Sequence, residues 1–345
     1  MIILFVSVFV KNIYSFGGYI EVLVCGALYW ASSKRSRTSN LFICLCLLCP
    51  VLLFSQVSVI YFINDFASAF IVLSVIDIAS EVKLSSKQRH RIYALYLYYI
   101  ILFLLLMGDP ARYDGGDNRY IGLLPTATVS SSVLMMILIG LIEEYKTRKR
   151  KFVVFAFCTL IIMINIFICK TRSVLFVFPY LIYAFYRVTS IKRLRILSWM
   201  ITIAICISMF LVFINNADTL RLSAGEASTL TRLSLYEAEW RMIQEANYVV
   251  PAGFQACILM IQEMTSEDFS PHNSLFSYWI DWGVFWLLYL IVLYKKLKTF
   301  VLRNECVIPV CLILLFILSC ALHNILLYSF IWMPMILILN NFKKA

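Results

Sequence analysis

The sequence predicts an all-α fold, a polytopic bundle of about 11–12 transmembrane helices with one partly helical loop outside the cytoplasm. Two observations carry this prediction. Hydrophobic residues make up 62% of the chain and charged residues only 14%, whereas soluble domains carry nearer a quarter charged residues. The apolar residues also fall in repeated runs of about 17–25 residues, the length that crosses a bilayer core as a helix.

The first third of the chain contains several predicted spans. They cover residues 16–31, 41–62, 67–79 and 92–107, and the short run 2–10, extended through Tyr14, would make the twelfth span. We expect an outer turn at Asn64 and Asp65 between the second and third of these spans, because two polar residues interrupt the apolar run there. A polar outer loop is expected over residues 109–122.

The rest of the chain repeats the pattern. The expected spans are residues 123–142, 152–169, 174–186, 196–214, 274–293, 307–322 and 326–339. A four-residue turn, 170–173, and a long hydrophilic loop, 215–273, lie between spans. Because no internal repeat, linker or low-complexity segment appears, residues 1–345 are interpreted as one integral membrane domain that contains this loop.

Basic residues orient the spans. Lys and Arg cluster in alternate short loops, which are therefore expected on the cytoplasmic side. The long loop has three arginines, no lysine and eight acidic residues, which places it outside. The formal net charge of +11 thus reflects membrane orientation, and nucleic acid is not an expected partner because no basic face appears elsewhere. The pattern predicts a multi-pass protein of a cytoplasmic membrane, in contact with membrane lipids.

The long loop is predicted to be ordered. Residues 228–247 read as an amphipathic helix with one apolar face and a separate charged row. The apolar positions are Leu233, Tyr236, Trp240 and Ile243, and the charged row is Glu237, Arg241 and Glu245. After Pro251 and Gly253 comes a second apolar piece, 254–264, which is too short to span. It could re-enter the membrane only when packed against protein.

Arginines near the outer face are the first candidates for chemistry. Arg172 lies in the four-residue turn, where a charge near the hydrocarbon is costly unless it is paired or functional. Arg232 begins the amphipathic helix. Both could bind an anion, because guanidinium donors match phosphate oxygens; the alternatives are an interfacial Arg172 that reaches water and an Arg232 on a solvated or ion-paired face.

Weaker phosphate-binding candidates are Lys170, Arg119 and Arg241. For Arg241 an ion pair with Glu237 or Glu245 is the simpler interpretation. His272 precedes an apolar span, and its ordinary pKa suits proton transfer near neutral pH; a structural histidine is the alternative. Asn273 is placed to cap the following helix.

Two aspartates within predicted spans, Asp77 and Asp281, are either functional groups or interfacial, solvated ones. Cys44, Cys46 and Cys49 lie within one span without His or acidic partners. They are interpreted as small apolar residues rather than metal ligands, and no metal site is predicted.

Four short motifs carry a family resemblance. They are Arg119-Tyr120-Ile121-Gly122; Lys170-Thr171-Arg172-Ser173; Thr231-Arg232-Leu233 with Trp240 and Pro251-Ala252-Gly253; and Pro271-His272-Asn273-Ser274-Leu275 with Gly283. Together with the predicted topology, they resemble the O-antigen polymerase and O-antigen ligase superfamily of bacterial membrane glycosyltransferases.

This resemblance implies glycan transfer at the outer face of the bacterial cytoplasmic membrane, from an undecaprenyl-pyrophosphate-linked oligosaccharide. Arg172 and Arg232 would neutralise the pyrophosphate leaving group, and His272 would orient or deprotonate the acceptor hydroxyl. Arg119, Lys170, Arg241 and Asn273 would contribute to substrate binding. No cofactor or metal is expected, since the donor is already activated. A chain-length regulator is a conceivable protein partner.

Three functions stay open. The first is a polymerase, whose acceptor is a sugar hydroxyl on another lipid-linked repeat unit. The second is a ligase, whose acceptor is the lipid A-core. The third belongs to another class, a lipid-linked glycan transporter or flippase, which would show internal repeats and broken helices in corresponding halves. The absence of a repeat and the long outer loop, which transport does not require, argue against the transporter. The polymerase and the ligase share architecture and chemistry, and the modest length of the loop favours the polymerase.

Overall fold

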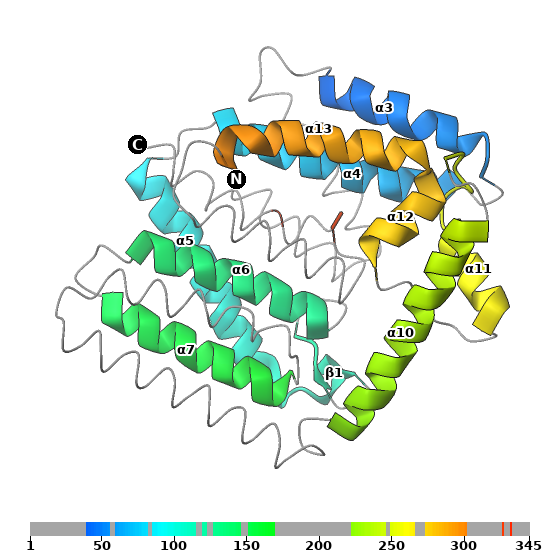
Figure 1. Ribbon diagram of the computed structural model, residues 1–345. Coiled ribbons are helices and arrows are strands. Elements are labelled where there is room, and N and C mark those ends of the chain that lie inside the picture. The colour runs from blue at the N-terminus through cyan, green and yellow to red at the C-terminus, as the bar shows by residue number, and fades with distance from the viewer. Residues whose placement is uncertain are drawn as a thin grey trace. The chain divides into compact units, whose positions relative to one another are not determined.

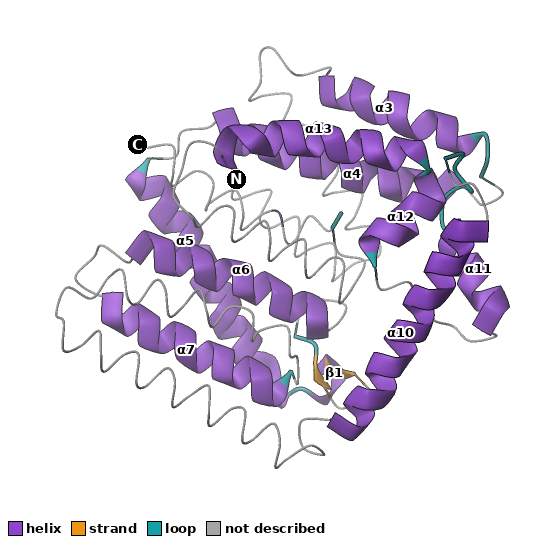
Figure 2. Ribbon diagram, viewed as in Figure 1, coloured by secondary structure: helices purple, strands orange, loops and turns teal. Residues whose placement is uncertain are grey.

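The computed structural model describes just over half of the chain. The described residues are 39–55, 59–81, 85–114, 119–122, 127–145, 151–169, 222–245, 249–265, 273–301, 326–327 and 332. They fall into two compact units, one built from segments up to Ser86 and from Arg232 onward, and the other from Lys87 to Thr231. Helices dominate this part of the chain, and the strands within it are two-residue segments (Figure 2).

In the first unit three helices lie side by side (Figure 1): α3 (Ser39–Leu52), α4 (Val59–Glu81) and α13 (Val284–Val301). The short helix α12 (Ser274–Trp282) contacts α3 and α13, and it also packs on α11 (Ala256–Thr265). The unit therefore joins the amino-terminal helices to helices that follow the predicted long loop.

Apolar side chains remain exposed along these helices. They include Leu41, Phe42 and Leu45 of α3, Val59, Ile60 and Ile63 of α4, and Leu287, Leu288 and Ile291 of α13. Two described segments, Val59–Asp77 and Lys87–Gly108, are long and apolar enough to cross a membrane. Exposed aliphatic surface on such helices is what contact with lipid requires.

The turn between α3 and α4 lies earlier than the sequence predicted. α3 ends at Leu52, and the backbone N–H of Leu53 and of Phe54 donate to Pro50 and Val51 in a turn. Asn64 and Asp65, the predicted turn residues, lie inside α4 instead. The prediction placed the turn at the first charged residue of the apolar stretch, Asp65, whereas residues 53–58 between the two helices include the uncharged polar residues Ser55, Gln56 and Ser58.

The predicted span 274–293 is also divided. α12 ends at Trp282 and α13 begins at Val284, with Gly283 between them at φ 57° and ψ −135°. This backbone conformation is one that residues with a Cβ rarely adopt. A continuous apolar run therefore conceals a helix break, which hydropathy alone does not reveal.

The second unit contains α5 (Ser86–Leu105), α6 (Ala127–Tyr145) and α7 (Lys151–Ile168), with α6 packed on α7. Side chains from Ser130 to Ile142 of α6 are all buried. A helix that is apolar on every side is expected to be enclosed in this way.

The predicted outer loop after α5 is ordered by short elements. Two 3₁₀ turns, Leu106–Gly108 and Pro110–Arg112, lead to the antiparallel pair β1 (Tyr113–Asp114) and β2 (Arg119–Tyr120). The Tyr120 hydroxyl donates to the carbonyl oxygen of Phe103 in α5. The loop is thus tied back to the helix that precedes it.

Gly122, the glycine of the Arg119-x-x-Gly122 motif, has φ +66°. A Cβ there would lie 2.6 Å from the ring of Phe103. Both the backbone and the close ring contact require glycine, which accounts for this residue on structural grounds.

Candidate functional site

Residues 249–253, called the strap below, fill the break between α12 and α13. The N–H groups of Ala252 and Gly253 donate to the carbonyl oxygens of Ile280 and Asp281 at 3.0 Å each, and the N–H of Val284 donates to Val249 at 3.0 Å. These bonds satisfy backbone groups that the break leaves without helical partners. The strap belongs to the predicted long loop, so this loop is attached to the helix that follows it.

Gly253 lets the strap approach the end of α3. It has φ +108°, and a Cβ built on it would lie 2.7 Å from Cα of Ser55. Only glycine fits both constraints. The glycine of the Pro251-Ala252-Gly253 motif is therefore explained by a backbone contact.

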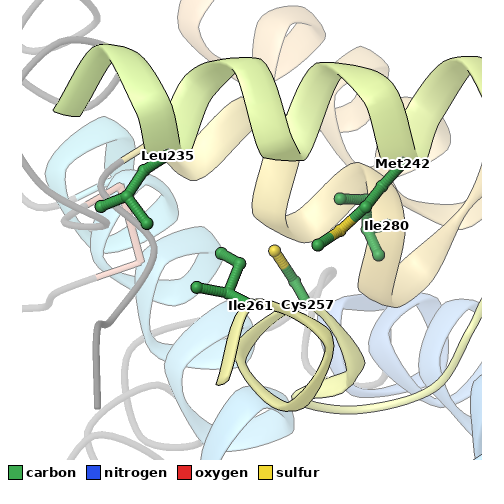
Figure 3. Close-up of a cluster of buried hydrophobic side chains, with 5 residues drawn as sticks. All are labelled: Leu235, Met242, Cys257, Ile261 and Ile280. Carbon is green, nitrogen blue, oxygen red and sulfur yellow. The ribbon is translucent and has the colours of Figure 1, made fainter. Parts of the chain in front are cut away.

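The helix α10 (Leu222–Glu245) confirms that the loop is partly helical. From Arg232 onward it belongs to the first unit, where it rests on α11 and α12 through a shared apolar cluster, called the seat (Figure 3). The seat consists of Leu235 and Met242 of α10, Cys257 and Ile261 of α11, and Ile280 of α12. A short apolar helix can re-enter a membrane only if it packs against protein. The helix α11 packs in this way against α10 and α12.

The buried face of α10 is turned relative to the predicted one. Leu235, Ala238 and Met242 are buried, whereas Trp240, assigned to the apolar face, is 48% exposed. The indole ring lies against Phe276 of α12, with centroids 5.7 Å apart. The prediction for Trp240 was wrong because α11 and α12 cover the neighbouring face of α10. Consecutive residues of a helix point about 100° apart, so a shift of one residue is enough to turn the buried face. Glu237, Arg241 and Glu245 are exposed, as the charged row predicted.

Asp281 caps α11 from a distance. Its Oδ1 accepts the N–H of Cys257 at 2.8 Å, in the first turn of α11. The residue before this helix, Gln255, has φ +60°, which is not the conformation of an N-cap residue. A side chain from α12 thus replaces the local cap, which explains a carboxylate inside an apolar segment without a catalytic role.

Glu239 is the unusual acid in this region. It lies on the buried face of α10 with no exposed surface, and neither carboxyl oxygen has a hydrogen-bond partner in the described part of the chain. Burial, and to a lesser degree the Asp281 carboxylate, raise the pKa of Glu239 to about 8. The group is therefore mostly protonated at neutral pH. In the sequence Glu239 counts only among the acidic residues of the loop. Its position between Leu235 and Met242, two apolar residues at helical spacing, was the signal that it could lie on a buried face.

A third acid extends the group. Asp65 of α4 accepts the indole N–H of Trp282 at 3.1 Å and interacts electrostatically with Asp281. Trp282 in turn packs against Trp286 edge to face, with centroids 5.4 Å apart. Glu239, Asp281 and Asp65, called the acid group below, thus come from the three helices α10, α12 and α4.

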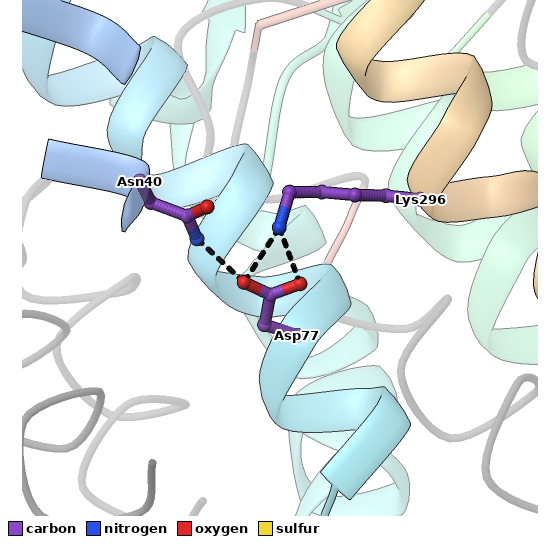
Figure 4. A network of polar contacts seen from close by, with 3 residues as sticks. All are labelled: Asn40, Asp77 and Lys296. Atoms are coloured by element: carbon purple, nitrogen blue, oxygen red, sulfur yellow. Dashed lines mark hydrogen bonds and ion pairs between the residues drawn. The ribbon is translucent and has the colours of Figure 1, made fainter. Parts of the chain in front are cut away.

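The other aspartate predicted within a span, Asp77, has a different environment. Lys296 of α13 approaches both of its oxygens at 2.7 Å, and the Asn40 amide donates to Oδ2 at 2.7 Å (Figure 4). Three helices meet at this carboxylate. Its contacts are those of a structural ion pair, so no further role is needed to explain the charge.

The described residues include four of the seven site residues predicted from the sequence. Asn273 caps α12: its side chain accepts the N–H of Leu275 at 2.9 Å and of Phe276 at 3.4 Å, which confirms the predicted cap. Arg241 is exposed on α10. Arg232 lies within α10, and only its backbone is described. All three belong to the first unit.

Arg119 belongs to the second unit, where it pairs with Asp114 in the register of the two strands. Arg172, Lys170 and His272 lie outside the described residues, so their roles stay predictions. Groups of three or more His, Cys, Asp or Glu suited to a metal ion are not found among the described residues.

Comparisons with known proteins add no relative. A scan against protein-family models finds no match, and searches of curated proteins and of solved structures find none either.

Proposed function

We propose that this chain is a multi-pass protein of the bacterial cytoplasmic membrane that polymerises undecaprenyl-pyrophosphate-linked oligosaccharide repeat units at the outer face. The observation that carries the proposal is the packing of the long loop. α10 and α11 rest on α12, the helix that opens directly after Pro271-His272-Asn273. Two parts of the loop, α10 from Arg232 onward and the strap, are thereby held to the same unit as Asn273, the residue that ends the loop.

Helix orientation supports the proposed topology. In the first unit the beginning of α3 and the ends of α4 and α13 meet at Asp77. In the second unit Arg89, near the beginning of α5, pairs with Glu144, near the end of α6, at 3.4 Å. Within each unit, these are the ends that the basic loops assign to the cytoplasm.

The proposed chemistry is a displacement at the anomeric carbon of the donor sugar. The acceptor hydroxyl oxygen bonds to that carbon, the bond from the carbon to the pyrophosphate oxygen breaks, and His272 takes the hydroxyl proton. Undecaprenyl pyrophosphate leaves with the electron pair, and Arg172 and Arg232 stabilise the developing negative charge.

Transport of a lipid-linked glycan is the second candidate, because one observation favours it. The break at Gly283 interrupts a membrane segment, and broken helices line the sites of many transporters. In the described part of the second unit, α5, α6 and α7 show no corresponding break. The polymerase accounts for the break differently, as the place where the loop is fixed over the membrane.

Deletion of the gene followed by gel analysis of surface lipopolysaccharide separates the candidates. A polymerase predicts chains that stop at one repeat unit. A ligase predicts loss of attached repeats with accumulation of lipid-linked polymer. A transporter predicts repeat units that remain on the cytoplasmic side, inaccessible to an external glycosidase. An unchanged pattern in a host that makes lipopolysaccharide would rule out the first two.

Variants test the residues. Arg172→Ala, Arg232→Ala and His272→Ala are each expected to abolish complementation at normal protein level. Lys298→Ala is the matched control, because Lys298 is exposed on α13 at the end assigned to the cytoplasm. Full activity of any of the first three variants would remove that residue from the mechanism.

A further inference from the structure

Glu239 lies between the apolar contacts that hold α10 in place. Leu235 and Met242, on either side of it along the helix, insert into the seat toward Cys257 and Ile261 (Figure 3). Glu237 and Arg241, two residues away in each direction, are exposed. The helix thus buries one carboxyl within its contact surface while its other charged groups face outward.

The groups that face Glu239 do not neutralise a negative charge. α12 contributes Asp281, α11 contributes the Cys257 thiol, and Asp65 of α4 interacts with Asp281. Within the described chain no lysine or arginine forms an ion pair with Glu239. An ionised carboxylate would therefore be buried without a counter-charge or a hydrogen bond, which is among the most costly arrangements in a folded protein.

We propose that Glu239 is a proton-operated latch. The helix α10 packs on α11 and α12 while Glu239 carries a proton, and α10 separates from these two helices when the proton is released. The latch follows from the burial of Glu239 and the acids around it. Its biological meaning, which is to open and close the loop over a lipid-linked substrate, rests on the proposed function.

The direction of the pH dependence follows from linkage. In the seated helix the pKa of Glu239 is about 8, against an ordinary value of 4.5, which an exposed Glu239 would regain. Between these two values the opened form releases its proton and the seated form keeps it. The opening equilibrium therefore rises about tenfold per pH unit in this window and levels off above about pH 8.

Cys257 supplies a reporter, because its thiol is fully buried in the seat. A variant that retains only this cysteine is purified in detergent, and its reaction with a maleimide is timed from pH 5.5 to 9. The thiol itself reacts faster at high pH, so each rate is divided by the rate of the same protein carrying Glu239→Gln. Gln keeps the shape of the side chain without a charge.

The expected ratio is already about tenfold at pH 5.5, because the window begins near pH 4.5. It rises about tenfold per pH unit from there and is constant above about pH 8. Glu237→Gln, an exposed position on the same helix, is the control and is expected to follow the wild-type curve. A ratio that does not change with pH would overturn the latch. Because no glycan transfer is measured, this result stands whether or not the polymerase is confirmed.

A second readout avoids removal of the other cysteines. Hydrogen exchange of the α10 backbone from Leu235 to Ile243 is compared between the wild-type protein and Glu239→Gln over the same pH range. The same rise in the ratio is expected. If the α10 backbone were equally protected from exchange in the two proteins at every pH, Glu239 would act through packing alone, and the proposal would be refuted.

Discussion

Helix α4 carries two aspartates with opposite environments. Asp77, near its end, contacts Lys296 and Asn40. Asp65 lies about 18 Å away along the helix, at 1.5 Å per residue, and faces Asp281 in the acid group. One end of the first unit therefore contains a carboxylate paired with a lysine, and the other contains neighbouring carboxyls without an ion-pair partner among the described residues.

The difference shows how one helix can be fixed at one end and adjustable at the other. A buried ion pair has a defined geometry and costs much to break. Glu239 is buried without a hydrogen-bond partner in the described chain, so its place in the packing depends on pH. Four predictions follow that separate these two ends.

Lys296→Met is expected to have the largest effect. Of the two partners of the Asp77 carboxylate that Figure 4 shows, this change removes the ammonium group and leaves the Asn40 amide. Removing one partner of a buried pair costs about 3–5 kcal/mol. Thermal unfolding in detergent would measure this loss. The double variant with Asp77→Asn is expected to recover most of the stability; no recovery would mean that Lys296 acts through packing alone.

Gly253→Ala tests the other end, where the strap meets Ser55. A Cβ at 2.7 Å from a backbone atom, on a residue with φ +108°, is expected to cost about 2–4 kcal/mol. Gly108→Ala is the matched control, because a Cβ there meets no atom within 4 Å. Equal unfolding midpoints for the two variants would contradict the close approach of the strap.

Glu239→Gln is expected to change stability with pH. The pKa of Glu239 is raised to about 8 from 4.5, so the wild-type protein is destabilised as pH rises through this window, where the unfolded chain releases a proton that the folded chain keeps. The variant lacks this loss. Its advantage is expected to be small near pH 4.5 and about 3 kcal/mol at pH 6.5. Thermal midpoints recorded at both pH values would show a pH-independent difference if Glu239 were exposed.

Asn273→Ala is expected to have the smallest effect, about 1 kcal/mol, because it removes the cap of α12. Asn273→Ser retains a capping oxygen and is expected to restore the unfolding midpoint. The pair also isolates substrate binding. A serine variant that is stable but inactive would assign Asn273 a contact with substrate in addition to the cap.

Features that depend on neighbours in sequence were predictable. The cap at Asn273 and the exposed row of Glu237, Arg241 and Glu245 follow from local geometry, and both are confirmed. α5 ends at Leu105, two residues before the predicted end of its span. In each case a side chain and the backbone it affects lie within one or two helical turns.

Features that depend on distant partners were not predictable. Asp65 looked like a turn residue until Trp282 supplied its hydrogen bond. The break at Gly283 looked like continuous helix because its partners are in the strap. Glu239 counted only among the acidic residues of the loop, because the helices that cover its face, α11 and α12, come later in the chain. Periodicity describes one helix at a time, whereas these features are set by packing between helices.

The strap also bears on how the chain is assembled during synthesis. Residues 249–253 precede α12 and α13 in the sequence, so they leave the ribosome before the helix break whose backbone they satisfy. Chains are made from the amino terminus, and open backbone groups at membrane depth are costly. The partner for the break is therefore already present when Gly283 emerges. The strap is made first, so its backbone groups are available to bond with α12 and α13 as these helices form.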